Sequence, residues 1–106
     1  MQNLTLVSED NRRKLFEFGE GLWKCAKYVE VKEDCIIGNH YHKLKDECFL
    51  LTEGEMIVTL GADVNKVSAP CVIDVPRGTY HKFEAKKGCK IVGLCSEGFN
   101  KHDDHL

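Results

Sequence analysis

The sequence predicts an all-β protein, a small antiparallel barrel or sandwich, and three observations support this. Stretches that alternate apolar and polar side chains follow one another from residue 22 to residue 95, and a period of two is typical of strands with one buried face. Turn-forming sequences such as "KLKD", "PRG" and "KKG" separate these stretches. Only one segment has the features of a helix. Many short strands with almost no helix are typical of barrels and sandwiches.

That helical segment is "SEDNRRKLFEFGEG", residues 8–21. Ser8 is a suitable N-cap, acidic residues occupy the first turn, and glycines close the segment. Leu15, Phe16 and Phe18 would form its apolar stripe. The prediction is a short N-terminal helix, with a partly extended edge segment as the alternative.

The predicted strands lie within residues 22–32, 34–42, 47–60, 71–76, 79–85 and 89–95. The sequence "GADVNK", residues 61–66, is interpreted as a turn. Four large apolar residues on these strands are expected to line the barrel interior: Phe49, Met56, Val58 and Phe83.

Composition limits the class of protein. A chain of 106 residues fits one domain, residues 1–106, with its own core. The net charge of −2 gives no reason to expect a nucleic acid or an anionic membrane as partner, and the apolar runs are too short to span a bilayer. The first residues do not form a secretory signal, and the six cysteines form no CxxC pair and sit mostly in apolar runs. We therefore expect a cytoplasmic protein with reduced, mostly buried thiols.

Four polar residues suggest a metal site. His40 and His42 point to the same face of a strand because side chains alternate, and Tyr41 points to the other. A hairpin can bring Glu47 opposite them, provided that the strand does not slip by one residue and turn Glu47 outward. His81, after the turn "PRG", can face inward beside them. Imidazole and carboxylate groups suit iron, manganese, zinc or nickel, and such a site leaves a coordination position open.

These residues also carry a resemblance. The pattern H-x-H-x4-E-x6-G, here His40, His42, Glu47 and Gly54, resembles the first cupin motif, and P-x-G-x2-H, here Pro76, Gly78 and His81, resembles the second. The resemblance implies a double-stranded β-helix, the cupin or jelly-roll barrel, in which His40, His42, Glu47 and His81 hold one divalent metal ion (Fe, Mn, Ni or Zn). The chain departs from the family pattern in three places: Asp34 stands where the family usually has its first glycine, and Pro70 and Ala85 stand at the ends of the second motif.

The run "GNHYH" is similar to cupins that process nucleotide-linked sugars, some of which use histidine to move protons without metal. This resemblance implies an isomerase or epimerase acting on an activated or phosphorylated sugar, with His40, His42 or His81 as general base or with a metal as Lewis acid. Two alternatives stay open: a metal-dependent dioxygenase acting on a small organic substrate, and a non-enzymatic cupin that binds a small molecule.

Four basic residues flank the site: Lys43, Lys45, Arg77 and Lys82. They suggest a rim for a phosphate or carboxylate, with Arg77 favoured, although a solvated surface is the simpler interpretation of each residue. Tyr41 and Tyr80 are expected to face away from the cavity.

The two ends of the sequence carry further expectations. The tail "NKHDDHL" contains His102, Asp103, Asp104 and His105 and is expected to fray rather than to bind a second metal. The segment "LTLV", residues 4–7, can add to the sheet of a second copy, so we expect a homodimer.

Overall fold

The computed structural model describes residues 4–12, 14–19, 21–98 and 101–106. Nearly all regular structure in these ranges is strand. The elements are β1 (Thr5–Glu9), β2 (Lys14–Glu17), β3 (Cys25–Glu30), β4 (Cys35–His40), β5 (Glu47–Glu53), β6 (Glu55–Leu60), β7 (Asp63–Ser68), β8 (Cys71–Val75), β9 (His81–Ala85), β10 (Lys90–Cys95) and the short 3-10 helix η1 (Lys101–Asp103).

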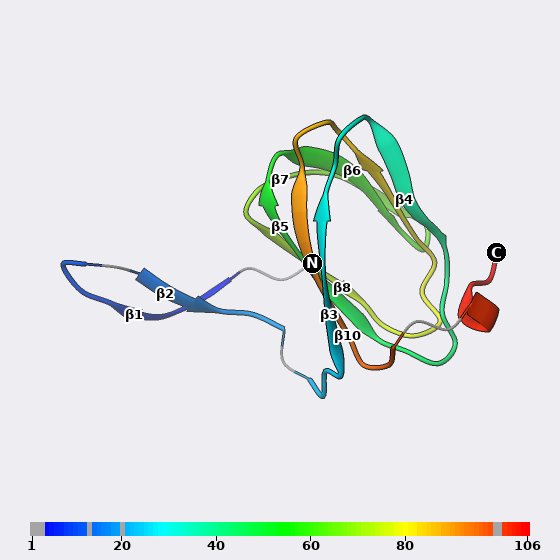
Figure 1. Ribbon diagram of the computed structural model, residues 1–106, viewed down its shortest axis with the longest axis horizontal. Coiled ribbons are helices and arrows are strands. Elements are labelled where there is room, and N and C mark those ends of the chain that lie inside the picture. The colour runs from blue at the N-terminus through cyan, green and yellow to red at the C-terminus, as the bar shows by residue number, and fades with distance from the viewer. Residues whose placement is uncertain (1–3, 13, 20, 99–100) are drawn as a thin grey trace.

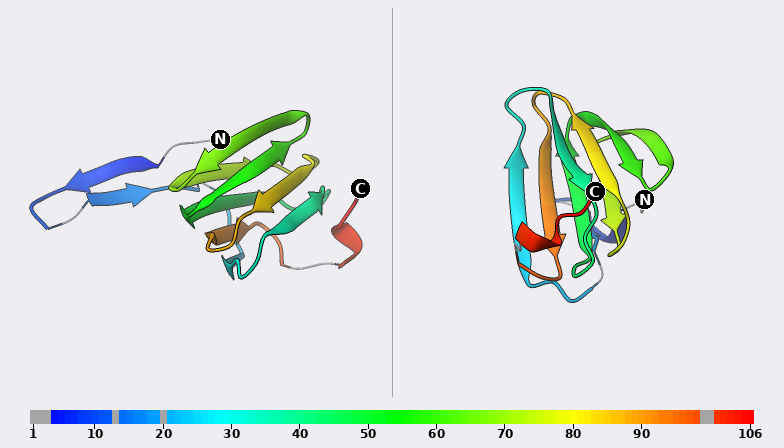
Figure 2. Two further views of the ribbon diagram at one scale, coloured as in Figure 1. Left: turned by 90° about the horizontal axis from the view of Figure 1, so that it is seen from above. Right: turned by 90° about the vertical axis from the view of Figure 1, so that its right-hand side faces the viewer.

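Eight of the strands form two four-stranded antiparallel sheets, with the orders β3-β10-β5-β8 and β4-β9-β6-β7. The sheets face each other and close into a flattened barrel (Figure 1), and the two views of Figure 2 show the layers from above and from the side. Strands far apart in sequence are neighbours, since β10 lies between β3 and β5. The predicted all-β barrel is therefore confirmed.

The hydrophobic core fills the space between the two sheets. Phe49, Met56, Val58 and Phe83 are all buried there, as predicted. The rings of Phe49 and Phe83 meet edge to face with centroids 5.0 Å apart, a favourable aromatic geometry. The ring of His81 lies 5.7 Å from that of Phe83. The histidine site therefore packs directly on the hydrophobic core.

The predicted helix at residues 8–21 is wrong. Ser8 lies in β1, and β1 and β2 form an antiparallel hairpin in which Leu6 is opposite Phe16. The alternative of an extended edge segment is nearer to the structure. Phe16 and Phe18 flank Glu17, which is the two-residue period of a strand. The hairpin projects from the barrel in Figures 1 and 2, and the side chain of Leu15 lies outside the described structure.

The predicted turn at residues 61–66 is too long. It ends at Ala62, and the residues after it form β7, which pairs along β6 with Val67 opposite Met56. This strand lies at the edge of its sheet, and most of its side chains are exposed. Only Val67 is buried, so the strand shows almost no hydrophobic pattern.

The cysteines are less uniformly buried than expected. Cys48, Cys89 and Cys95 are buried, Cys25 and Cys71 are half-buried, and Cys35 is exposed. Burial and the neighbouring Asp74 raise the pKa of Cys48 to about 12, so this thiol stays protonated and unreactive at neutral pH. No helix among the described residues has the length and apolar character needed to cross a membrane.

Candidate functional site

Three histidines converge at one end of the barrel. His40 closes β4, His42 follows it, and His81 opens β9, directly opposite His40 in the strand register. The ring centroids of His40 lie 4.4 Å from His42 and 4.6 Å from His81. One nitrogen of each residue can be chosen so that all three atoms lie within 4.8 Å of one another. Such a set of nitrogens can hold a metal ion.

A bulge in β4 makes this convergence possible. The register with β9 shifts between Gly38 and His40, and both Gly38 (φ 85°) and Asn39 (φ 73°) adopt the left-handed conformation. A Cβ atom on Gly38 would lie 2.8 Å from Cδ2 of His81, which is closer than carbon atoms approach. Bulges of this kind redirect side chains beside functional sites. Gly38 is thus required both for the turn of the backbone and for the space that His81 occupies.

Glu47 reaches the same place from the other sheet. It opens β5, is buried, and places its Oε1 atom 3.1 Å from Nε2 of His42 and 3.8 Å from Nε2 of His81. The possible one-residue slip does not occur, because Glu47 shares the inner face of β5 with Phe49 and Leu51. The thiol of Cys95 donates to Oε2 of Glu47 across 3.6 Å. The structure therefore brings together all four residues that the motif spacing selects.

The atoms of Glu47 and His42 that face each other are both acceptors. Nδ1 of His42 lies 2.9 Å from the carbonyl oxygen of Asp103, and a carbonyl only accepts, so Nδ1 carries a proton. In the neutral ring, Nε2 then presents a lone pair toward Glu47 Oε1, which has no hydrogen-bond partner among the described residues. Two lone pairs at 3.1 Å need a proton or a cation between them. The donor set therefore fits a metal ion, and it equally fits a shared proton.

Two of the histidines are held neutral. Burial, with the nearby charges of His40 and His42, lowers the pKa of His81 to about 4. Burial and the charge of His42 also lower the pKa of His40 below its usual value of 6.5. Desolvation disfavours the charged imidazolium, as in other buried sites. At neutral pH each ring therefore keeps one nitrogen lone pair, which can bind a metal or accept a proton.

Lys45 differs from its expected place on a solvated surface. Its side chain is 4% exposed and lines the cavity that contains the histidines. No ion pair of Lys45 occurs within the described part of the chain, and its charge is a smaller contributor, after burial, to the lowered pKa values of His40 and His81. The sequence gives little signal for this, because Lys45 lies in the turn before β5, where the strand period does not fix the direction of a side chain.

The other flanking residues lie outside the cavity. Arg77, favoured as an anion receptor, is exposed and binds the carboxylate of Asp46 at 3.2 Å. Lys43 is exposed and Lys82 is half-buried, and neither lines the cavity. The hydroxyl of Tyr80 hydrogen-bonds the side chain of Asn39.

The C-terminal tail is ordered against the site, so the expectation of a frayed tail is wrong. The backbone of His105 pairs with Tyr41 through bonds of 2.8 and 3.0 Å, and Asp103 is 2% exposed. The carboxylate of Asp103 accepts hydrogen bonds from the backbone amides of Lys43 and Leu44. A second metal site is not supported, because these amides use the carboxylate.

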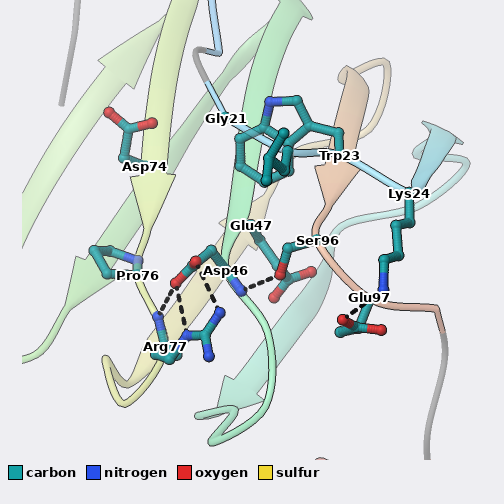
Figure 3. A pocket seen from close by; sticks show the side chains of 11 residues that line it. Gly21, Trp23, Lys24, Asp46, Glu47, Asp74, Pro76, Arg77, Ser96 and Glu97 are labelled. Carbon is teal, nitrogen blue, oxygen red and sulfur yellow. Dashed lines mark hydrogen bonds and ion pairs between the residues drawn. The ribbon is translucent and has the colours of Figure 1, made fainter.

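Two hollows border Glu47. The smaller is the histidine cavity, of about 160 Å³, lined by His40, His42, Lys45, Glu47, Phe49, His81 and Asp104 among others. The larger is an open groove of about 750 Å³ beside Trp23, drawn in Figure 3. There Asp46 pairs with Arg77 and Lys24 pairs with Glu97, so two of its positive charges are already neutralised. The histidine cavity is the better place for chemistry because its titratable groups converge.

Comparison with known proteins gives a clear result for the fold. No family model and no curated protein matches the sequence. Several solved structures match. A QdtA 3,4-ketoisomerase variant from Thermoanaerobacterium thermosaccharolyticum in complex with TDP is 22% identical, with a TM-score of 0.73 over 95% of this chain and 83% of that one. A 3,4-ketoisomerase from Helicobacter canadensis is 21% identical, with a TM-score of 0.74 over 94% of this chain and 85% of that one.

A third structure is more distant in sequence and similar in shape. ChmJ, a 3'-monoepimerase from Streptomyces bikiniensis in complex with dTDP-quinovose, is 14% identical, with a TM-score of 0.81 over 98% of this chain and 66% of that one. Identities this low establish shared architecture and leave the activity to be argued from the site. The sheet order, the register of the two motifs and these comparisons lead to one conclusion: the chain has the cupin fold, a double-stranded β-helix.

Proposed function

We propose that this chain is an isomerase or epimerase that moves a proton next to a carbonyl group of a nucleotide-linked sugar. The observation that carries the proposal is the convergence of three histidines, at least two of them held neutral, with a buried lysine in one cavity. Neutral imidazoles are bases, and a buried ammonium stabilises negative charge. The fold is shared with 3,4-ketoisomerases and a 3'-monoepimerase, and this likeness supports the same class of reaction.

His40 is the best candidate for the general base. It is the least buried of the three histidines, so it is the one a bound sugar reaches first. With a pKa of about 4, His81 is the weaker base, and Nδ1 of His42 is committed to Asp103. In the proposed step a histidine removes a proton from the carbon beside the carbonyl, and the electron pair moves to the carbonyl oxygen. For the keto isomer, the hydroxyl proton on the deprotonated carbon moves to the former carbonyl oxygen, and the histidine returns its proton to the former carbonyl carbon. For the epimer, a second group on the opposite face donates a proton to the same carbon from which the first was removed.

Lys45 is proposed to stabilise the negative charge on that oxygen. Lys45 is buried, lines the cavity together with the histidines, and has no ion-pair partner among the described residues. A preorganised donor in an enclosed site contributes more than the same donor in water. Replacing Lys45 by Met should lower kcat by about 100-fold. Lys43→Met in the same turn is the matched control, since Lys43 is exposed, and it should keep the wild-type rate.

A divalent ion also fits the site. His40, His42, His81 and Glu47 would hold it, and when bound it would supply Lewis-acid polarisation of the substrate carbonyl. A nitrogen that binds a metal cannot accept a proton at the same time, so the two roles of the histidines are alternatives. Elemental analysis of protein purified without chelator separates them. About one equivalent of iron, manganese, nickel or zinc per chain supports the ligand role, and no retained metal after loading and desalting overturns it.

The reaction is tested by deuterium exchange. TDP-4-keto-6-deoxyglucose, the sugar nucleotide bound in one QdtA variant structure, is incubated with the protein in heavy water and followed by proton NMR. We expect deuterium to enter beside the carbonyl, with His40→Asn slowing this by about 100-fold or more and Lys66→Gln, an exposed change on β7, leaving it unaltered. Substrate-dependent oxygen uptake would favour a dioxygenase, and binding without exchange would favour a non-enzymatic cupin. Either result contradicts the proposal.

A homodimer is also proposed, formed through the projecting hairpin. Leu6, Val7 and Phe16 on β1 and β2 are 52%, 48% and 43% exposed, which is unusual for large apolar side chains grouped on one small element. A second copy would cover them. A cytoplasmic location is proposed as well, supported by the free thiols buried in the barrel, such as Cys48 and Cys95.

A further inference from the structure

Asp103 and His105 make three sets of polar contacts with the segment that carries His42. The carbonyl of Asp103 accepts from Nδ1 of His42 at 2.9 Å. The carboxylate of Asp103 accepts from the amides of Lys43 and Leu44 at 2.9 and 3.2 Å. The main chain of His105 pairs with that of Tyr41. All three contacts fall on residues 41–44, the segment that carries His42 and leads to Lys45.

The first contact determines which nitrogen of His42 is available. A neutral imidazole has one N–H and one lone pair, and the hydrogen bond made by one nitrogen selects the state of the other. Because Asp103 offers a carbonyl oxygen, Nδ1 must be the donor, so in the neutral ring the lone pair is on Nε2, which lies 3.1 Å from Oε1 of Glu47. The other nearby groups that can accept a proton from Nδ1 are the carboxylates of Asp103 and Asp104, at 3.8 and 3.4 Å. Both are farther away than the carbonyl oxygen of Asp103, at 2.9 Å.

The second contact holds the turn. Among the described residues, the amides of Lys43 and Leu44 have no acceptor other than this carboxylate. The contact therefore anchors the turn that leads to Lys45, a residue of the cavity lining.

We propose that Asp103 is a positioning residue of the histidine site: its carbonyl sets the tautomer of His42, and its carboxylate holds the turn that carries Lys45. This deepens the proposed function and rests on it for the effect on turnover, whereas the effect on the tautomer is independent of any substrate. Asp104 has a lesser part. It is 44% exposed and its side chain lies at the mouth of the cavity, so it contributes charge and no anchor.

The test is a nitrogen-15 NMR measurement on metal-free protein at one mildly alkaline pH. Two-bond proton–nitrogen correlations distinguish an imidazole protonated on Nδ1 from one protonated on Nε2. In the wild type we expect His42 to be protonated on Nδ1. Removing residues 101–106 should convert His42 to the Nε2-protonated form or to a mixture. Asp103→Ala keeps the carbonyl but removes the carboxylate that holds the tail against the amides of Lys43 and Leu44, so it should shift His42 in the same direction through loss of docking. Lys66→Gln, the exposed change on β7, is the control and should leave the wild-type pattern.

Turnover gives the second measurement. With TDP-4-keto-6-deoxyglucose as probe, Asp103→Ala should lower kcat about 10- to 100-fold with little change in KM, while Asp103→Asn, which keeps one acceptor oxygen, should recover part of the loss. A shortened chain that is folded by circular dichroism and still shows pure Nδ1 protonation overturns the proposal. So does Asp103→Ala with the wild-type tautomer and rate, which covers the case in which the shortened chain does not fold. If the wild type shows no turnover but the tautomer changes as expected, the proposed function fails and the positioning role stands.

Discussion

The two terminal segments behave in opposite ways. The N-terminal hairpin, β1 and β2, carries exposed Leu6, Val7 and Phe16 and projects away from the barrel (Figure 1). The C-terminal segment, residues 101–106, is polar in sequence, and yet Asp103 is buried against the site. The apolar side chains of the hairpin stay exposed, whereas the polar C-terminal segment packs on the barrel. Matched hydrogen-bonding partners, rather than hydrophobicity, decide which terminal segment packs on this barrel.

The difference has a physical basis. Among the described strands, β1 of the hairpin pairs only with β2, so each strand keeps an outer edge as well as exposed apolar side chains, and a second copy can pair with that edge and cover that surface. The tail makes its bonds to the barrel itself, at Tyr41, His42 and Lys43. A buried carboxylate with two amide donors is stable where an unpaired one is not.

The largest effect is expected on dimer formation, when the exposed apolar side chains of the hairpin are replaced. Replacing both Leu6 and Phe16 by Asp removes two apolar contacts per chain, each worth about 1.5–3 kcal/mol when fully buried, so dimer dissociation should increase by about 100-fold or more. Sedimentation at equal concentrations should then give the mass of one chain, 12.0 kDa, instead of about twice that value. A wild type that already sediments as a monomer would remove the dimer from consideration.

A single methyl group added at Gly38 should destabilise the end of the barrel that carries the histidines and the docked tail. Gly38→Ala places a Cβ 2.8 Å from His81 at a φ of 85°, which combines backbone strain with overpacking and should lower the free energy of unfolding by about 2–5 kcal/mol. Gly61→Ala is the matched control, because Gly61 also has a positive φ and its Cβ would meet nothing within 4 Å. It should cost about 1–2 kcal/mol. Equal losses in urea unfolding would mean that the approach of Gly38 to His81 has no energetic weight.

Acid should lower the free energy of unfolding of the barrel at a higher pH than it affects association through the hairpin. Since the pKa of His81 is lowered to about 4 in the folded protein from 6.5, the unfolded chain binds the proton first as pH falls. The stabilising contribution is complete above about pH 6.5 and is lost progressively toward pH 4, by about 3 kcal/mol in all. Urea unfolding of metal-free protein across this range measures the loss, and His81→Asn should flatten the pH dependence.

The proposed dimer provides the internal control for that experiment. No histidine occurs in residues 4–18, so hairpin-mediated association should stay constant from about pH 6.5 to about pH 5, above the range in which free carboxylates ordinarily take up protons. The histidine interpretation would be contradicted if His81→Asn kept the full pH slope.

The smallest effect is expected at Arg77. Its bond to Asp46 is 3.2 Å long, but the side chains are 57% and 41% exposed, and exposed ion pairs contribute little to stability. Arg77→Ala should leave urea unfolding and deuterium exchange near wild-type values. A loss of turnover similar to that of Lys45→Met would show that the open groove beside Trp23, rather than the histidine cavity, receives the anionic part of the substrate.

Motif spacing and strand alternation located most of the barrel and the four converging residues. What they missed follows from interactions that no local pattern records. Ser8, which suggested a helix cap, lies in β1, and Asp10, which suggested the first helical turn, lies in the hairpin turn instead. There the amide of Arg12 donates to the side chain of Asp10 at 2.7 Å, a contact typical of Asx turns. Docking of the tail depends on a hydrogen bond between residues 61 positions apart. Lys45 is a different case: it lies in the turn before β5, where alternation gives no direction, and the general preference of lysine for the surface favours exposure.

The strand order has a consequence for how the protein folds. β3 has one partner in its sheet, β10, and the pairs run from Glu30 with Lys90 to Cys25 with Cys95. Before β10 pairs with β5, β3 has no strand in its sheet with which to pair. Pairings across such long sequence separations are slow to form because loop closure must precede them. Refolding should therefore be limited by the arrival of β10, and an unfolded population would expose β3 as an unpaired strand that is prone to aggregate.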